Sequence, residues 1–221
     1  MSTFSQRLIV LTLLLTPGTA AAGVWSRLSF SVAPTAVLSL TGNYNDTAAM
    51  KNMVIPGAGL GLVLRYKFSQ NLFLDAGYSY NWMFYRKDTR PKDYTSEKPA
   101  WIIPSYTLNG TVFLTSKHPV RPYVTAGGGF CPWWFSSRVT GGTLFWFPGT
   151  DDVKFSKISW TVNGGMGIEV AISSKAALFA EAKYHYIFAR DASRFGTGSF
   201  TDQSVLGIRL GMTVYLGKNS Y

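Results

Sequence analysis

The feature that most constrains this chain is an alternation of polar and apolar residues in eight segments, always with the apolar side chains at even-numbered positions. In the clearest segment, residues such as Asp75, Gly77 and Ser79 alternate with a set of apolar ones: Leu72, Leu74, Ala76, Tyr78, Tyr80, Trp82 and Phe84. A period of two residues is the pattern of a β-strand whose two faces meet different surroundings. The sequence therefore predicts an all-β fold.

The connections between the predicted strands alternate in length. The strands are expected at Leu28–Leu40, Ala58–Phe68, Leu72–Arg86, Trp101–Thr115, Tyr123–Phe135, Ile158–Ile172, Ala176–Phe188 and Ser204–Leu216. The short connections are 69–71, 116–122 and 173–175, and the long ones are 41–57, 87–100, 136–157 and 189–203. Short periplasmic turns and long outer loops are typical of an eight-stranded antiparallel up-and-down transmembrane β-barrel, and an even strand count returns both ends of the chain to the periplasmic side.

The first 22 residues have the pattern of a secretory signal peptide. Arg7 supplies the positive region, Leu8 to Leu15 the apolar stretch, and Ala20 to Ala22 the small residues before a cleavage site. We expect cleavage near Ala22, which leaves residues 23–221 as one barrel domain. Export of a barrel predicts location in the cell outer membrane.

Composition agrees with a barrel that contacts lipid. Hydrophobic residues make up 47% of the chain and charged residues only 14%, against about 25% in ordinary globular domains. No segment after Ala22 has the roughly 20 apolar residues of a membrane-spanning helix. The single Cys131 excludes an internal disulfide.

The net charge is strongly positive. It is formally +10, and removal of Arg7, the one charged residue of the signal, leaves +9. Because an exported chain does not meet nucleic acid, we expect no nucleic-acid partner. Attraction to the anionic head groups of outer-membrane lipid is favoured. The alternative is loop charge that has no partner.

Residue size indicates which face of the barrel meets lipid. The odd positions are rich in Ser, Thr, Asn and Gly, which suit a narrow interior, whereas the even positions carry residues that we expect to be too large for it. Many of these lie near the outer strand ends, where an interfacial aromatic girdle belongs. The predicted membrane-interface aromatics are Tyr78, Tyr80, Trp82, Tyr106, Trp134, Trp160, Tyr184 and Tyr186.

Three prolines conflict with uninterrupted strands, because proline cannot donate a hydrogen bond to the sheet. Pro34 is near the middle of the first strand, so we expect a β-bulge there. Pro104 and Pro132 are expected near the outer rim, where strand pairing has already ended.

The odd face also holds ionisable and amide side chains that we expect inside the barrel. The predicted lumen ion-pair network is Arg65, Lys67, Asp75, Glu169, Glu181, Lys183 and Arg209, and the other polar lumen residues are Asn109, Asn163 and His185. Near-balanced charge suits a filled lumen, because an unpaired buried charge costs several kcal/mol. The network is interpreted as a static plug, with an ion gate as the alternative.

Two short turns predict the register inside this network. The turn at 69–71 places Arg65 directly opposite Asp75 as a cross-strand ion pair. The turn at 173–175, with Ile172 opposite Ala176, places Glu169 against Phe179 and Gly167 against Glu181. Arg209 or Lys183 should then lie near the two glutamates.

The sequence shows no reactive cluster that would predict catalysis or a cofactor. His185 has no serine beside it on the same face, so we interpret it as a hydrogen-bonding lumen residue rather than a base. His118 and His185 are far apart and predict no metal site. In the loop at 136–157, Phe145, Trp146 and Phe147 are candidates for contact with lipid or a surface partner, or for packing over the barrel mouth.

Three segments resemble the bacterial outer-membrane β-barrel domain family, whose small eight-stranded members are similar to the OmpA transmembrane domain and to OmpX. Residues 121–130, RPYVTAGGGF, resemble its fifth strand, and residues 163–169, NGGMGIE, its sixth. Residues 180–186, AEAKYHY, resemble the seventh. These motifs imply barrel geometry and no particular activity.

The resemblance also bears on the interior and on assembly. It matches Glu169, Glu181 and Arg209, by strand and face, to the interior charges of an OmpA-type plug. Family members often end on an aromatic residue that is read by the barrel-insertion machinery. Here Gly217 to Ser220 separate the last predicted strand from Tyr221.

Three functional hypotheses follow. The first is a structural barrel without catalysis, whose long loops serve surface contact. The second is a narrow conduit for small or apolar molecules, as in the OmpW-like barrels that the chain also resembles. The third is a lipid-modifying enzyme of the outer membrane.

Overall fold

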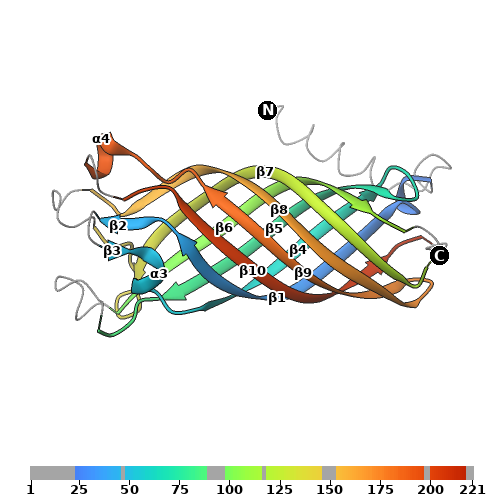
Figure 1. Cartoon of the computed structure of the whole chain (residues 1–221), viewed down its shortest axis with the longest axis horizontal. Helices are drawn as coiled ribbons and strands as arrows, with labels where there is room; N and C mark the ends of the chain where they lie inside the picture. The colour runs from blue at the N-terminus through green and yellow to red at the C-terminus, as the bar shows by residue number, and fades with distance from the viewer. Residues whose placement is uncertain are drawn as a thin grey trace, which may run out of the picture.

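The protein is a closed barrel of eight long antiparallel strands (Figure 1). The structure, a computed structural model, describes residues 23–45, 48–88, 98–115, 118–145, 153–196 and 200–217. The barrel strands are β1 (Leu28–Thr41), β4 (Gly57–Lys67), β5 (Leu72–Phe84), β6 (Pro99–Phe113), β7 (Val120–Ser137), β8 (Ser156–Ser173), β9 (Ala176–Ile187) and β10 (Gln203–Tyr215). Each pairs with its neighbours in the chain, and β1 closes the barrel against β10. The predicted fold class is confirmed.

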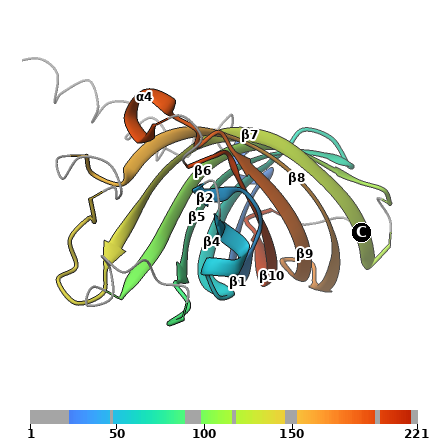
Figure 2. The ribbon, with the colours of Figure 1, turned by 60° about the vertical axis from the view of Figure 1, so that its left-hand side comes forward.

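Four short elements lie at the end of the barrel that carries the long loops, which we call the long-loop end (Figures 1 and 2). They are β2 (Asn43–Asn45), β3 (Ala48–Ala49), α3 (Met50–Met53) and α4 (Ala192–Phe195). The opposite end, with the short turns, is the short-turn end. Within the described residues, no helix has the length and apolar character needed to cross a membrane.

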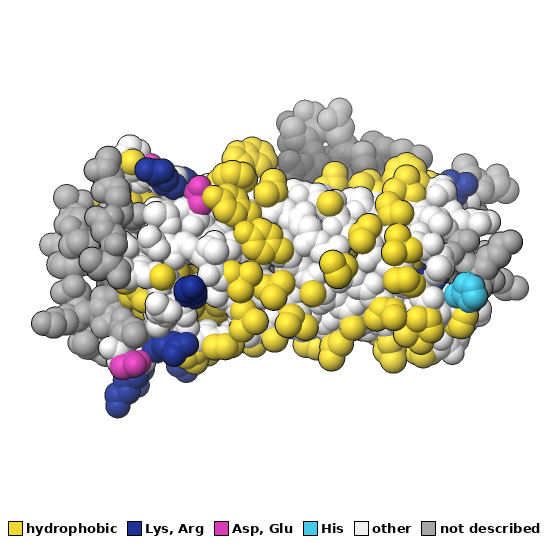
Figure 3. All heavy atoms as spheres, viewed as in Figure 1, with side chains coloured by type: hydrophobic (Ala, Val, Ile, Leu, Met, Phe, Trp, Pro, Cys, Tyr) yellow, Lys and Arg dark blue, Asp and Glu magenta, His cyan; other side chains and the backbone are white. Residues whose placement is uncertain are grey.

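Even and odd positions separate onto the two faces as the alternation predicts. Even positions such as Leu108 and Trp160 point outward and are 56% and 74% exposed, whereas Thr111 and Thr213 point inward and are fully buried. Hydrophobic side chains are spread along the visible wall, and Lys and Arg lie mostly toward its long-loop end (Figure 3). Since the outward face is apolar and the inward face is packed, the wall is suited to contact with hydrocarbon rather than with water.

The prolines are accommodated without the predicted irregularities. Pro34 pairs with Leu60 in an unshifted β1–β4 register, so the expected bulge is wrong. On the β10 side the ladder lapses between Val32 and Thr35 and then resumes in the same register. A missing donor therefore interrupts pairing locally without displacing the strand.

Pro104 and Pro132 share one gap in the sheet, which also corrects the prediction. The β6–β7 ladder pairs Ile102 with Trp134 and Tyr106 with Phe130, so the unpaired stretch between them sets the two prolines opposite each other. Both strands continue beyond this gap toward the long loops. Because the two prolines face each other, the two missing backbone N–H donors leave one gap in the β6–β7 ladder rather than two.

The two turn-based registers are present. Arg65 pairs with Asp75 across β4 and β5. Glu169 faces Phe179 and Gly167 faces Glu181 across β8 and β9. The turn itself differs from the prediction, because Ser173 rather than Ile172 pairs with Ala176, after a shift between Ala171 and Ser173.

Candidate functional site

The interior of the barrel is the candidate site, and it has three layers along the axis. An ion-pair layer lies nearest the short turns, a polar chamber occupies the middle, and an apolar plug fills the long-loop end. Each layer comes from odd positions on several strands, because alternate residues of every strand point inward.

Arg65 is at the centre of the ion-pair layer. Its Nε and Nη2 donate to the two carboxylate oxygens of Asp75 at 2.8 and 3.1 Å, and its Nη1 donates to Glu169 Oε2 at 3.3 Å. The guanidinium carbon also lies 5.6 and 5.5 Å from the ring centres of Phe73 and Phe113. Charge-assisted bidentate pairing of this kind fixes geometry as well as charge.

Arg121 is the second cation of the layer, and the sequence analysis missed it. Its Nη2 donates to Glu169 Oε1 and to the hydroxyl of Tyr215, the latter at 2.8 Å. The residue is 1% exposed. It was assigned to a turn because β7 was predicted to begin at Tyr123, whereas β7 begins at Val120. Arg121 is odd-numbered, so extending the alternation from Tyr123 by two residues toward the N-terminus would have placed its side chain on the inward face.

Glu181 organises the other side of the layer. It accepts from Arg209 Nε at 2.9 Å and Nη2 at 2.5 Å, and from the hydroxyl of Tyr123 at 3.0 Å. Thr111 donates to Asp75 at 2.8 Å on the Arg65 side of the layer. Tyr123 and Tyr215 were also missed, although both are odd-numbered residues of predicted strands.

Two predicted members form no ion pair with a described residue. Lys67 is the last residue of β4 and half-buried at the short-turn rim, where water can solvate it. Lys183 is 4% exposed, but neighbouring Glu181 is already bound by Arg209 and Tyr123. Of the two predicted cations, only Arg209 pairs with a glutamate, and Glu169 is paired by arginines from β4 and β7 instead.

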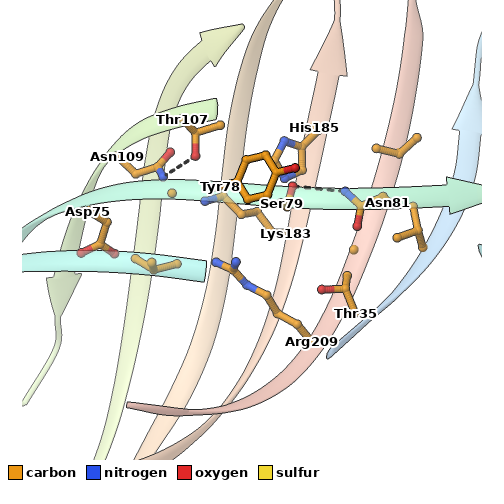
Figure 4. Close-up of a pocket in the computed structure, with 15 residues that line it drawn as sticks. Thr35, Asp75, Tyr78, Ser79, Asn81, Thr107, Asn109, Lys183, His185 and Arg209 are labelled. Carbon is orange, nitrogen blue, oxygen red and sulfur yellow. Dashed lines mark hydrogen bonds between the residues drawn. The ribbon is translucent and has the colours of Figure 1, made fainter. Parts of the chain in front are cut away.

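The polar chamber is a cavity of about 30 Å³ in the middle of the barrel (Figure 4). Lys183, His185 and Arg209 point into it, and its wall includes Asn81 and Asn109. Several buried polar atoms around it have no described hydrogen-bond partner: Thr35 Oγ1, Asn81 Oδ1, Asn109 Oδ1 and His185 Nδ1. Asn163 lies next to the chamber, opposite His185, and both of its amide atoms are unpartnered among described residues.

The apolar plug corrects the expectation that the interior holds only small or polar side chains. Trp101 is fully buried, and Trp133 and Phe135 are each 1% exposed. Phe135 stacks on Phe155 with ring centres 4.0 Å apart, and Trp133 Nε1 donates to Ser159 at 3.0 Å. The other large members of the plug are Tyr44, Met50, Met53, Met83, Tyr85, Phe195 and Phe200.

This plug was visible in the numbering. Met83, Trp101, Trp133 and Phe135 all occupy odd positions near the long-loop ends of their strands. The average composition of the odd positions over whole strands does not reveal these large residues, because Gly, Ser and Thr dominate the strand centres. The interior accommodates them because side chains from the long-loop elements, including Met50 of α3, pack against them at the mouth.

The predicted interfacial aromatics divide into two groups. Most lie toward the long-loop ends of their strands: Trp82, Trp134, Trp160, Tyr184 and Tyr186. Tyr78 and Tyr106 instead pair with each other at the middle of β5 and β6, with ring centres 5.0 Å apart. Tyr80 follows two residues later on β5. A mid-strand position favours the membrane interior over the interface for Tyr78 and Tyr106, whereas the interfacial location of the other aromatics stays a prediction.

The geometry offers little for covalent chemistry. The structure gives His185 no hydrogen bond to a described serine or carboxylate, and its Nδ1 is unpartnered. Within the described residues, no group of three His, Cys, Asp or Glu side chains is placed to hold a metal. Of the loop aromatics, Phe145 is 46% exposed and pairs with Lys154, while Trp146 and Phe147 lie outside the described residues.

Comparison with known proteins places the chain in a family. Residues 8–213 match the outer membrane protein β-barrel domain. Comparison with curated protein sequences gives no match.

Solved structures match this chain at low sequence identity. The Neisserial surface protein A, NspA, aligns with a TM-score of 0.56 at 13% identity, over 85% of this chain and 96% of that one. Ail of Yersinia pestis gives 0.45 at 16% identity, over 86% and 97%. OprG of Pseudomonas aeruginosa gives 0.44 at 14% identity, over 86% and 96%. Together with the family match over most of its length, the lipid-suited wall identifies this chain as a member of the outer membrane protein β-barrel domain family.

Proposed function

We propose that this protein is a non-enzymatic, integral outer-membrane barrel with a closed lumen, whose role is structural or lies in contacts made at the cell surface. The observation that carries the proposal is the double filling of the lumen. The ion-pair layer fixes one side of the chamber and the apolar plug fills the other. A solute moving along the axis would have to displace both.

The ion-pair layer supports a static interior. Each of its three carboxylates has at least two charged or hydroxyl donors from different strands. Breaking one buried pair leaves an uncompensated charge, at a cost of about 3–5 kcal/mol. The aromatic plug adds stacked and edge-on ring contacts, each worth about 0.5–1.5 kcal/mol beyond burial.

The long-loop rim supports a surface role. Among the described residues there, exposed cations outnumber exposed carboxylates. The exposed acid is Asp88, and the exposed cations are Lys51, Arg86, Lys87, Lys98, Arg138, Lys154, Arg190 and Arg194. Such a rim favours anionic head groups. Under this proposal the partners are outer-membrane lipid along the wall, a surface partner at the long loops, and the barrel-insertion machinery during assembly.

Conductance in planar bilayers tests the closed lumen. The purified protein should give no steady current, whereas a water-filled porin measured in the same bilayers should conduct. The conduit hypothesis replaces this proposal if the wild type conducts steadily and Glu181→Gln or Arg209→Ala changes that current. Liposome swelling with small uncharged solutes extends the test to molecules that carry no current.

A separate measurement tests the absence of lipid chemistry. Lipid A from cells with and without the protein should have the same mass spectrum. A mass difference that depends on the protein would replace the proposal with the enzyme hypothesis.

A further inference from the structure

The polar chamber has an excess of positive charge. Among the described residues, the charged side chains of the interior are the cations Arg65, Arg121, Lys183 and Arg209 and the carboxylates Asp75, Glu169 and Glu181. All three carboxylates are bound by arginines, and no described carboxylate forms an ion pair with Lys183. A charged group at this depth is stable only with a counter-charge or strong hydrogen bonds.

We propose that the polar chamber is a binding site for a small monovalent anion of halide size, held between Lys183 and Arg209. Lys183 enters from β9 and Arg209 from β10, and both line the same cavity (Figure 4). The proposal is independent of the closed-lumen function, since a resident ion would leave the lumen blocked.

The free donors of the chamber converge from three strands. Arg209 uses Nε and Nη2 for Glu181, so its Nη1 is available. That Nη1 and Thr35 Oγ1 lie 3.3 and 4.0 Å from the point where a side chain on Gly61 would begin, so both groups reach the same region of the barrel interior. Thr35 Oγ1 is buried with no described partner, and the ammonium of Lys183 has three further donors.

The size of the cavity limits the ligand. A volume of about 30 Å³ holds one or two particles of water size. Among common anions a halide ion is closest in size to water, whereas phosphate, sulfate and carboxylate-bearing solutes are much larger. The unpartnered carbonyl oxygens of Asn81 and Asn109 cannot contact an anion favourably, so one water beside the ion is needed to donate to them.

Anomalous diffraction with bromide tests the site directly. The wild-type protein is refolded into detergent in sodium bromide and crystallised, and data are collected at the bromine absorption edge. A bromide peak in the chamber, in contact with Lys183 Nζ and Arg209 Nη1, is expected. A chamber that contains only water would overturn the proposal.

A stability titration with a matched pair of variants gives a second test. Lys183→Met removes one of the two chamber cations at similar volume, and Lys175→Met removes an exposed cation in the turn before β9. Replacing gluconate by chloride at constant ionic strength should raise the unfolding temperature of the wild type and of Lys175→Met by a few degrees per tenfold increase in chloride.

Lys183→Met should lose this dependence and the bromide peak. A chloride effect of equal size in Lys183→Met would assign it to the surface and contradict the proposal. If Lys183→Met does not fold, the crystals of the wild type and of Lys175→Met still decide the question.

Discussion

At the scale of single residues, the stability of the barrel interior depends on how completely a few charges are paired. Glu169 shows this most clearly, because it is 1% exposed and bonds Arg121, Arg65 and Tyr215. A buried ion pair of this kind adds little over a well-packed apolar pair, yet breaking it is costly. We therefore expect an isosteric substitution of one buried charged residue to change the free energy of unfolding strongly.

Glu169→Gln should lower the free energy of unfolding by about 3–5 kcal/mol, because it leaves Arg121 as an uncompensated buried charge. Guanidinium unfolding in lipid vesicles, followed by tryptophan fluorescence, measures the change. Asp88→Asn is the control, since this acid is exposed at the rim, and it should change stability by less than about 0.5 kcal/mol. Equal effects of the two changes would contradict the ion-pair layer.

A charge swap tests the Arg65–Asp75 pair, which the turn count predicted and which the structure holds at 2.8 Å. Asp75→Asn should reduce stability, as should Arg65→Asp and Asp75→Arg singly, and combining these last two should recover part of the loss, with a coupling between them of about 0.5–3 kcal/mol. Recovery should be incomplete because Arg65 also binds Glu169 and Asp75 also accepts from Thr111. The pairing is refuted if single and double variants unfold at the same denaturant concentration as the wild type.

At the scale of elements, close approach between strands requires glycine at particular positions. A Cβ on Gly129 of β7 would overlap the carbonyl oxygen of Tyr106 on β6. A Cβ on Gly110 of β6 would meet nothing within 4 Å. The two glycines lie on neighbouring strands, Gly129 on the inward face and Gly110 on the outward face, so Gly110 is the control for a position with open space around it.

Gly129→Ala should therefore cost about 1–3 kcal/mol of unfolding free energy, since the strands must separate locally to admit the methyl group. Gly110→Ala should be neutral or slightly stabilising, by up to about 1 kcal/mol. The same unfolding assay compares them. A neutral Gly129→Ala variant would show that the β6–β7 spacing is looser than described.

Much of the element layout could be predicted because one physical rule repeats. Parity assigns every strand residue to a face, and three-residue turns fix the registers that bring Arg65 to Asp75 and Gly167 to Glu181. Arg121 was missed because strand ends have no signal of their own and a proline follows at once. Proline also misled the prediction at Pro34, where the strand keeps its register with one interruption.

The long-loop elements could not be predicted, because tertiary packing decides them. The four-residue helix α3 has no side-chain hydrogen bond at its N-cap, and its buried residues are Met50 and Met53. Both belong to the apolar plug with Trp101 and Phe135. Local sequence gives no reason for a helix there, and the plug supplies one.

At the scale of the whole molecule, the barrel is a continuous sheet with no free edge, so it should unfold as a unit. The unheated protein in mild detergent should migrate on a gel as a compact band, and boiling should convert it to a band of different mobility. Glu169→Gln should convert at a lower temperature than the wild type or Asp88→Asn. A gradual smear in place of two bands would contradict a single cooperative barrel.

The central claim is that even positions face hydrocarbon while odd positions face a lumen that is sealed. The most direct test is ¹⁹F NMR of the barrel with 5-fluorotryptophan at every tryptophan, assigned by single Trp→Phe variants. A spin label on lipid chains should broaden the signal of Trp160 much more than those of Trp101 and Trp133, and a water-soluble paramagnetic agent should not broaden Trp101 or Trp133. Broadening of Trp101 and Trp133 by the water-soluble agent would show that the lumen is open. Broadening of these two signals by the lipid label, with Trp160 unaffected, would show that the odd positions face hydrocarbon instead of the even ones.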